Sequence, residues 1–387
     1  YLGGLQDNGT LYYNGNPLTL DNMWSGGDGA YCFFDEDDAS LSVTSIYYNQ
    51  YYVYMNGSWV NSLNNWSSGT FISPADFDYR KNEIYANAVD FVGNFGDHIL
   101  RLTNITGNEA GSYINIGTGS GLYFSAVTYS PHSTSIQSNL FVGNQEGRVF
   151  SVENANATPV ITEIGSPNFP VGNISCIAVG NSDDTLAATF SNYGVPSVWV
   201  TSNGGQSWTD VEANLPDMPI RWAIFHPMNS LQVMLATETG IWTTDNVFAN
   251  PVLWEPANDG LANVRVDMVR IRKSDYIVLA ASHGRGLFAS SSPWDVVLGT
   301  KEATKPLLTT YPNPTSGVVN IQYYLAGQTM VEINVVNTKG QTVLFEEQQT
   351  KGTFLKRLDL SDQPVGVYFM ILKAGGNVVA SEKLIVL

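Results

Sequence analysis

The sequence predicts an all-β protein in which a β-propeller of about six to eight blades is followed by a small antiparallel β-sandwich. The first observation is composition: hydrophobic residues make up 43 % and charged residues only 14 %, with 36 Gly, 20 Tyr and 9 Trp. This mixture is typical of short strands joined by turns, and no window has the apolar spacing of a capped helix. The second observation is a repeat of 45 to 51 residues, and the third is a change of pattern after Trp294.

Six copies of the repeat are visible in the first 294 residues. They begin near Ala30, Ala75, Ala126, Ile177, Ala223 and Met268, at intervals of 45, 51, 51, 46 and 45 residues. Each copy reads as two apolar strands, a third strand with an aromatic residue and a weaker fourth strand, separated by turns. Four short strands in such a length form a propeller blade, and blades must stack radially because one blade cannot bury both of its faces. A β-sandwich with chance spacing is the alternative.

Residues 1–22 resemble the outer part of one more blade. Leu2 to Thr10 match the second strand of the repeat and the turn after it, with no first strand ahead of them. Because the chain starts at Tyr1 in the middle of this motif, we expect that upstream sequence was processed or lies outside this chain. Either upstream residues complete the blade, or the ring closes through the last copy.

Acidic residues dominate the propeller part of the chain. The formal net charge is −17, and residues 1–300 hold 28 Asp and Glu against 10 Lys and Arg. Such a surface repels phosphate backbones and anionic membranes, so we expect no nucleic-acid partner. It suits neutral polysaccharides, cations or basic partners. No apolar run approaches the roughly 20 residues that span a bilayer.

Cysteine and histidine indicate no disulfide, metal or cofactor site. Cys32 and Cys176 fall on first strands three blades apart in the repeat. A disulfide needs Cα atoms within about 7 Å, so we predict two buried, unpaired thiols. The four histidines are scattered, one to a repeat, and none has metal-ligand spacing: His98, His132, His226 and His283. Neither a nucleophile motif nor a phosphate-binding loop is present.

One turn motif connects the repeat to known propellers. The segment from Thr201 to Trp208 follows the pattern Ser-x-Asp-x-Gly-x-x-Trp in outline, with Asn203 in the place of Asp. We expect Ser202, Asn203, Gly205 and Trp208 to be its structural residues. In such a turn the short side chain caps the backbone, the glycine accepts a positive φ and the tryptophan packs beneath. The motif resembles the Asp-box of sialidase, sortilin-type and xyloglucanase-type propellers. The resemblance covers residues 1–294 and implies a fold, with almost no information on chemistry.

Catalytic candidates come from the same resemblance. Sialidases of this kind need an arginine triad, and the first arginine here, Arg80, lacks the expected setting. Xyloglucanase-type hydrolases use two carboxylates across a cleft, one as acid and one as base. Carboxylates near first-strand starts are Asp28, Asp35, Asp76 and Asp78. We retain Asp28, which has glycines on both sides, and Asp76 as catalytic candidates; the alternative role for each is to cap a turn.

A second domain is expected at 309–387, after a propeller at 1–294 and a linker at 295–308. Alternating residues in Val331–Val335 and the hairpin turn Thr338–Gln341 indicate a small antiparallel sandwich. The domain opens with Tyr-Pro-Asn-Pro and closes with Lys-Leu-Ile-Val-Leu. Its landmarks are Pro312, Asn313, Pro314, Gly366, Tyr368, Lys383, Leu384, Ile385, Val386 and Leu387.

Together these landmarks closely resemble the type A sorting domain of type IX secretion cargo. The resemblance implies export to the cell surface or medium of a Bacteroidota-type bacterium. It also implies recognition by an outer-membrane shuttle β-barrel and translocon, and cleavage of the linker by a surface sortase. An ordinary appended β-sandwich is the alternative. Asp184-Thr185-Leu186 has the form of the O-glycosylation site used by such bacteria.

Local chemistry explains the landmarks. Pro312 and Pro314 stiffen the lead-in and hold Asn313 extended, whereas Gly366 is expected to allow a close turn into the strand of Tyr368. The last strand ends at the carboxy terminus, so we expect its apolar edge to be available for pairing.

The sequence therefore predicts a secreted surface protein whose propeller is a binding module for carbohydrate or protein. The competing hypothesis is a xyloglucanase-type glycoside hydrolase that uses paired carboxylates in the funnel. A third hypothesis, a mainly structural propeller within a larger adhesin, predicts further domains upstream.

Overall fold

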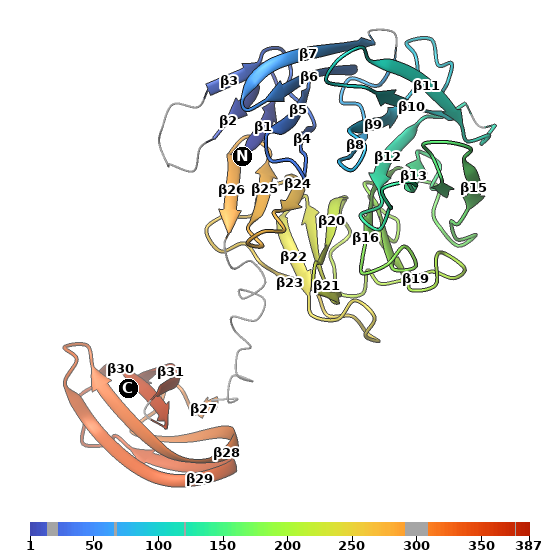
Figure 1. Ribbon diagram of the computed structural model, residues 1–387. Coiled ribbons are helices and arrows are strands. Elements are labelled where there is room, and N and C mark those ends of the chain that lie inside the picture. The colour runs from blue at the N-terminus through green and yellow to red at the C-terminus, as the bar shows by residue number, and fades with distance from the viewer. Residues whose placement is uncertain (14–21, 66–67, 120, 291–308, 376) are drawn as a thin grey trace. The chain divides into compact units, whose positions relative to one another are not determined.

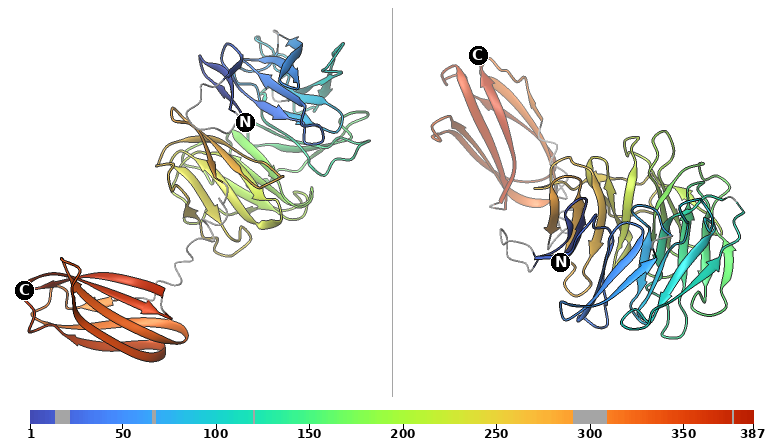
Figure 2. Two further views of the ribbon diagram at one scale, coloured as in Figure 1. Left: turned by 60° about the vertical axis from the view of Figure 1, so that its left-hand side comes forward. Right: turned by 90° about the horizontal axis from the view of Figure 1, so that it is seen from above.

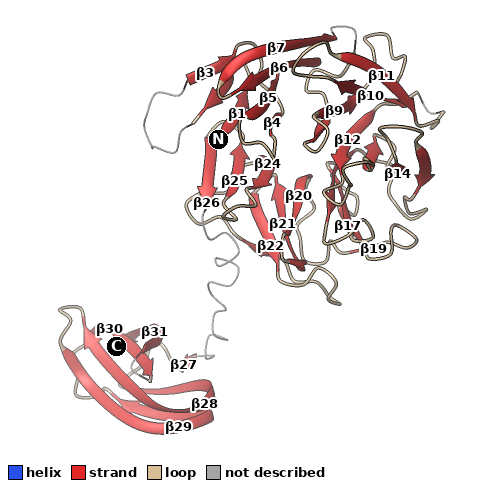
Figure 3. Ribbon diagram, viewed as in Figure 1, coloured by secondary structure: helices blue, strands red, loops and turns tan. Residues whose placement is uncertain are grey.

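A computed structural model describes residues 1–13, 22–65, 68–119, 121–290, 309–375 and 377–387. It divides into two compact units, Tyr1–Val297 and Leu298–Leu387 (Figures 1 and 2). All regular secondary structure in the described ranges is β-strand (Figure 3). None of these residues forms a helix with the length and apolar character needed to cross a membrane. The expected linker, 295–308, lies outside the described residues.

Within the described residues of the first unit, seven antiparallel sheets, called blades 1 to 7 below, follow one another around a ring (Figure 1). Blade 1 has three strands: β1 (Leu2–Leu5), β2 (Gly9–Tyr12) and β3 (Asn22–Ser25). Blade 2 has four: β4 (Cys32–Phe34), β5 (Leu41–Ser45), β6 (Asn49–Met55) and β7 (Ser58–Asn65). Blade 3 also has four: β8 (Ala75–Asp78), β9 (Glu83–Asn87), β10 (His98–Thr103) and β11 (Ala110–Asn115).

The remaining blades repeat this order. Blade 4 contains β12 (Phe124–Tyr129), β13 (Leu140–Asn144), β14 (Val149–Glu153) and β15 (Val160–Glu163). Blade 5 contains β16 (Ile174–Val179), β17 (Leu186–Phe190), β18 (Val198–Thr201) and β19 (Thr209–Asp210). Blade 6 contains β20 (Ile220–His226), β21 (Asn229–Thr237), β22 (Gly240–Thr244) and β23 (Glu255–Pro256). Blade 7 has three strands: β24 (Val266–Ile271), β25 (Val278–Ser282) and β26 (Gly286–Ser290).

The first strands of blades 2 to 7 coincide with the repeat starts expected from the sequence. Ala75 opens β8, and Met268 lies within β24. The degenerate copy at Ala30 begins two residues before β4. In blade 1 the described residues include no strand ahead of β1, which pairs only with β2. Gly3 of β1 faces Leu287 of β26, so blades 1 and 7 meet where the ring closes.

The hydrophobic cores lie between blades. Five clusters of buried side chains each combine two successive blades, from blades 2 and 3 to blades 6 and 7. Strand β17 shows how one strand serves two of them: Leu186 and Ala188 enter the cluster with blade 4, whereas Ala187 enters the cluster with blade 6. Successive side chains of a strand point to opposite faces, so each blade is buried only when it has two neighbours.

Two tryptophans seal the interfaces near the rim. Trp254, only 1 % exposed, donates its Nε1 hydrogen to the carbonyl of Val211 after blade 5, over 2.8 Å. Trp208 makes the same kind of bond to the carbonyl of Ile164 after blade 4, over 2.6 Å. Each indole is therefore buried with its one donor satisfied by the preceding blade.

The second unit is one curled sheet. Its strands are β27 (Thr309–Tyr311), β28 (Val318–Asn337), β29 (Thr342–Asp359), β30 (Gly366–Ala374) and β31 (Asn377–Val386). The order is β27-β28-β30-β31, with β29 also paired to β28. Strand β28 is long, and the alternating segment Val331–Val335 forms only its second half.

The sequence predicted a sandwich of two sheets, whereas this unit is a single sheet that curls. The β28–β29 register shifts between Leu325 and Thr329, and Figure 1 shows both strands curving along their length. Val319 and Ile321 at one end of β28 thereby share a buried cluster with Leu384 and Val386 of β31. At the other end of the hairpin, the expected turn forms, with the side chain of Asn337 accepting from two backbone amides.

The buried indole of Trp254 predicts a large effect on stability. Trp254→Ala should lower the free energy of unfolding by about 3–5 kcal/mol, because it leaves a cavity between blades 5 and 6. Trp59→Ala is the control, since Trp59 is 60 % exposed on β7, and should change stability by less than about 0.5 kcal/mol. Urea denaturation of the full chain measures both, and equal losses would contradict the assigned role.

Candidate functional site

The final strand, β31, is fixed on one side by pairing with β30 from Gly366↔Val386 to Ala374↔Asn377. Its side chains alternate at the carboxy terminus. Leu384 and Val386 are buried in the core of the second unit, while Lys383 and Leu387 are exposed. The terminal residues singled out in the sequence therefore divide into an inward pair that stabilises the domain and outward residues that a partner could contact.

The other side of β31 is bound by the Pro-Asn-Pro segment. Asn313 donates from Nδ2 to the carbonyl of Lys383 over 2.6 Å, and its Oδ1 accepts from the amide of Ile385 over 3.0 Å. The side-chain amide thus makes the two bonds that a neighbouring strand would make. Pro312 and Pro314, which flank Asn313, carry no backbone N–H and so take no part in this pairing.

Thr315 continues the same contact. Its amide donates to the carbonyl of Ile385, and its carbonyl accepts from the amide of Leu387, both over 2.8 Å. The threonine is only 1 % exposed, and its hydroxyl donates to the carbonyl of Val318 over 2.5 Å. We call Asn313 and Thr315 the terminal clamp. The expectation of an open edge at the carboxy terminus was wrong, because the clamp occupies that edge.

Two other landmarks, Tyr368 and Gly366, differ in how much they contribute to the structure. Tyr368 is buried in the core, and its hydroxyl donates to the carbonyl of Pro364 over 2.7 Å. Gly366 is the first residue of β30, and a Cβ placed there would meet no atom closer than 3.9 Å. The space around Gly366 therefore does not itself require a glycine at this position.

In the propeller, the two catalytic candidates both bind backbone amides. Asp28 accepts from the amide of Asp7 over 2.7 Å, which joins the segment after β3 to the β1–β2 turn. Asp76 accepts from the amides of Phe77 and Tyr129, and its carboxylate lies 4.0 Å from the guanidinium of Arg270. The two aspartates have no partner in common, so the structure does not join them into one site.

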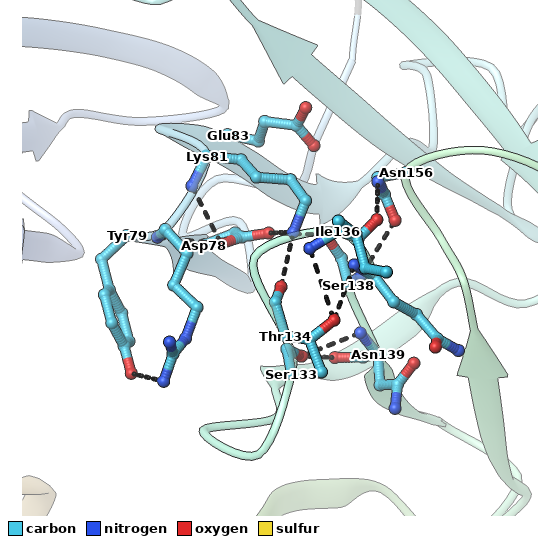
Figure 4. A network of polar contacts seen from close by, with 12 residues as sticks. Asp78, Tyr79, Lys81, Glu83, Ser133, Thr134, Ile136, Ser138, Asn139 and Asn156 are labelled. Atoms are coloured by element: carbon cyan, nitrogen blue, oxygen red, sulfur yellow. Dashed lines mark hydrogen bonds and ion pairs between the residues drawn. The ribbon is translucent and has the colours of Figure 1, made fainter.

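The other two carboxylates are turn caps. Asp35 accepts from the amides of Asp37 and Asp38. Asp78, which is fully buried, caps the turn to β9 and accepts from the hydroxyl of Ser138 in blade 4 over 2.5 Å (Figure 4). Lys81 extends the network by an ion pair with Asp78 and a bond to the carbonyl of Thr134 (Figure 4). Asp78 therefore holds two blades together.

A central cluster surrounds Asp76, although the sequence did not single out its other members. Arg270 of blade 7 lies over the ring of Trp222 at 4.8 Å, and Trp222 in turn contacts the ring of Tyr31 at 6.3 Å. Burial raises the pKa of the Asp76 carboxyl, and Arg270 acts in the opposite direction. Residues of blades 2, 3, 6 and 7 thus meet through one ion pair and two ring contacts.

The turn around Asn203 is held by its own side chains. Oδ1 of Asn203 accepts from the amide of Ser207 over 3.0 Å, and Thr201 Oγ1 accepts from the amide of Gly205 over 3.1 Å. Gly205 has φ of 83° and lies against Ile164, where a Cβ would approach the carbonyl oxygen to 2.6 Å. Ser202 is exposed beside this turn.

The remaining candidates show no chemical site. Cys32 on β4 and Cys176 on β16 are both free thiols, and burial raises the pKa of each to about 12. In the part of the chain that the structure describes, no group of His, Cys, Asp and Glu side chains could hold a metal ion. Thr185 is only 8 % exposed and bonds to Asn181, so an attached sugar would require its loop to open.

Comparison with known proteins assigns the second unit. Residues 309–387 match the family model described as the secretion system C-terminal sorting domain. This domain directs proteins through the type IX secretion system, so the chain is exported across the outer membrane to the cell surface or medium of a Bacteroidota bacterium. No curated protein matches the sequence.

Solved structures establish the propeller-like fold. One similar structure is PorZ, a surface component of the type IX system of Porphyromonas gingivalis, at 12 % identity and TM-score 0.51, covering 98 % of this chain and 55 % of that chain. Another is the GH74 xyloglucanase of Xanthomonas campestris, at 11 % identity and TM-score 0.55, covering 76 % and 50 %. A third is the Cps50 β-propeller domain of Myceliophteria thermophila, at 9 % identity and TM-score 0.51, covering 75 % and 92 %. The chain spans about half the length of the first two.

The terminal clamp predicts local protection of β31. Asn313→Ala removes both side-chain bonds, each worth about 1 kcal/mol, so amide exchange at Ile385 should become at least about tenfold faster while the domain stays folded. Hydrogen–deuterium exchange of the last residues measures this. Asn337→Ala is the matched control, since it removes an amide that caps the distant β28–β29 turn. Unchanged exchange at Ile385 in Asn313→Ala would show that Asn313 is not needed to hold the strand.

Proposed function

We propose that the terminal strand and its clamp form the sorting signal. The observation that carries this proposal is the pairing of Asn313 with Lys383 and Ile385, which brings the first and last landmarks of the domain into one structure. The outer-membrane shuttle β-barrel and translocon would bind the outward side chains of Lys383, Ile385 and Leu387. A surface sortase would then cut between the two domains, which we place at 1–294 and 309–387.

We further propose that the propeller is a binding module for carbohydrate or protein, displayed on the cell or released. All four candidate carboxylates accept hydrogen bonds from backbone amides, which suits structural support rather than proton transfer. We interpret the turn at Ser202–Trp208 as Asp-box-like, with a structural role at the rim. Ring closure through blades 1 and 7 makes the propeller a rigid support for its surface loops.

One observation favours the hydrolase alternative. A general acid needs a raised pKa, and burial raises the pKa of Asp76. Glu36 of blade 2 contributes to this rise, but its own carboxylate pairs with Lys273 over 2.6 Å. Asp76 is bonded to two amides and Glu36 to a cation, and these contacts suit a structural role for both carboxylates. We therefore rank binding above hydrolysis.

The sorting proposal predicts a failure of export. A chain that lacks Lys383–Leu387 should still have a folded propeller, but it should remain in the periplasm. Cell fractionation and surface proteolysis in a bacterium with a type IX system measure this, with Asn337→Ala as a control of normal export. Truncated protein at the cell surface would exclude the last five residues as an essential part of the signal.

The binding proposal predicts no hydrolysis. The full chain incubated with xyloglucan and other neutral polysaccharides should release no new reducing ends. Activity that is lost in Asp76→Asn and kept in Asp35→Asn would instead establish the hydrolase alternative. Asp35 is the matched control because it is a buried carboxylate that caps a turn outside the central cluster.

A further inference from the structure

An array of aromatic side chains, four of them exposed and two partly buried, lies on blades 2 and 3. It comes from the turn between β5 and β6, the segment between the two blades, the loop between β9 and β10, and strand β11. We call it the aromatic surface, formed by Tyr47, Tyr48, Phe71, Phe91, Phe95 and Tyr113. Phe91 is 59 % exposed, and Phe71, Phe95 and Tyr113 are each between 43 and 46 % exposed. Exposed aromatic side chains that gather in this way mark ligand or partner sites.

The rings are in contact across the two blades. Tyr48 of blade 2 lies 4.7 Å from Phe91 of blade 3 and 6.2 Å from Phe71, measured between ring centroids. Tyr47 also contacts Phe71, with the two ring planes within 16° of each other. The same β9–β10 loop carries Phe95, whose ring stacks on Tyr113 at 4.9 Å. The aromatic surface therefore consists of two groups of contacting rings that this loop joins.

The loop that carries Phe91 and Phe95 is held in place before any ligand arrives. Asp90 accepts from the amides of Val92 and Asn94 and from the Asn94 side chain, at 2.7 to 3.0 Å. A second observation is backbone strain. Tyr48 and Phe95 have φ of 61° and 58°, a region that bulky residues avoid. Such strain concentrates at functional positions, and a preorganised surface loses less entropy on binding.

Charge restricts what this surface can bind. The three segments that build it, 41–73, 82–98 and 110–123, contain no Lys or Arg. The β9–β10 loop carries Asp90 and Asp97, and the chain as a whole has a net charge of −17. Anionic glycans and a second copy of this acidic chain would be repelled. Neutral and basic ligands remain. Of these, a neutral sugar can also use the carboxylates and tyrosine hydroxyls beside the rings, which bond to its hydroxyl groups.

We propose that the aromatic surface binds a neutral polysaccharide chain, with the apolar C–H faces of successive sugar rings packed on Phe71, Phe91 and Phe95. Asp97 and His98, paired over 2.6 Å beside Tyr113, provide polar groups at one end of this path. The inference rests on the proposed binding function and assigns its ligand class and its place. An exposed ring that packs flat on a sugar contributes through its face, which distinguishes this role from general apolar contact.

The test separates ring stacking from apolar docking. The full chain is run in native gels that contain laminarin, galactomannan or xyloglucan, with polygalacturonate as an anionic probe. Phe91→Ala and Phe91→Leu should each weaken retardation by a neutral polysaccharide about fivefold to tenfold, since leucine keeps apolar volume but has no ring face. Tyr193→Ala is the matched control, because Tyr193 is 66 % exposed in the equivalent loop of blade 5, between β17 and β18.

Each possible result either supports or contradicts the proposed polysaccharide site. Loss of retardation in both Phe91 variants, with Tyr193→Ala unchanged, is the expected result. Retardation that Phe91→Leu keeps and Phe91→Ala loses would replace stacking by apolar docking, as for a protein partner. Equal retardation of all variants would overturn the aromatic surface as the site while leaving the binding function in place. A chain that none of the neutral polysaccharides retards, or that polygalacturonate retards, would overturn the ligand class.

Discussion

Blades 3 to 6 of the first unit each bury apolar side chains on two faces, and this requirement for two neighbours governs the rest of the structure. Alternate residues of β17 supply the cores on either side of blade 5, so neither core could form without the other. Hydrogen bonds also connect the first strands of successive blades. Ser125 and Thr128 of β12 donate to carbonyls of β16, and Ser175 of β16 donates to β20. Loops at the rim are thereby held in fixed positions by the whole ring.

The same requirement accounts for the abundance of acidic residues at turns. Asp78 and Asp183 each bind side chains of blade 4 from opposite sides, so carboxylates connect blades at the loops where the apolar cores end. Buried acceptors of this kind are stable only when their bonds are complete. An aspartate at the end of a first strand therefore has an architectural role before any chemistry is considered, and two of the four candidates, Asp35 and Asp78, are turn caps of this kind.

The local patterns were readable from the sequence, and the distant contacts were not. Repeat spacing located the inner strands because burial on both faces leaves continuous apolar runs, such as Leu186–Phe190 of β17. Asn313 was recognised only as part of a motif, since its partner Lys383 is 70 residues away and no local signal connects them. Thr315 was missed although it directly follows Pro314. The aromatic surface was equally hidden, because exposure of Phe91 depends on how separate loops meet.

The terminal clamp resolves a conflict between folding and recognition. A strand that ends at the carboxy terminus leaves unpaired amides and carbonyls, and such edges promote aggregation unless they are covered. Asn313 and Thr315 cover this edge with four hydrogen bonds. Recognition of the terminus by added strand pairing would have to break them first, whereas recognition through the outward side chains of Lys383, Ile385 and Leu387 would not. The clamp therefore favours readout of side chains on an already folded domain.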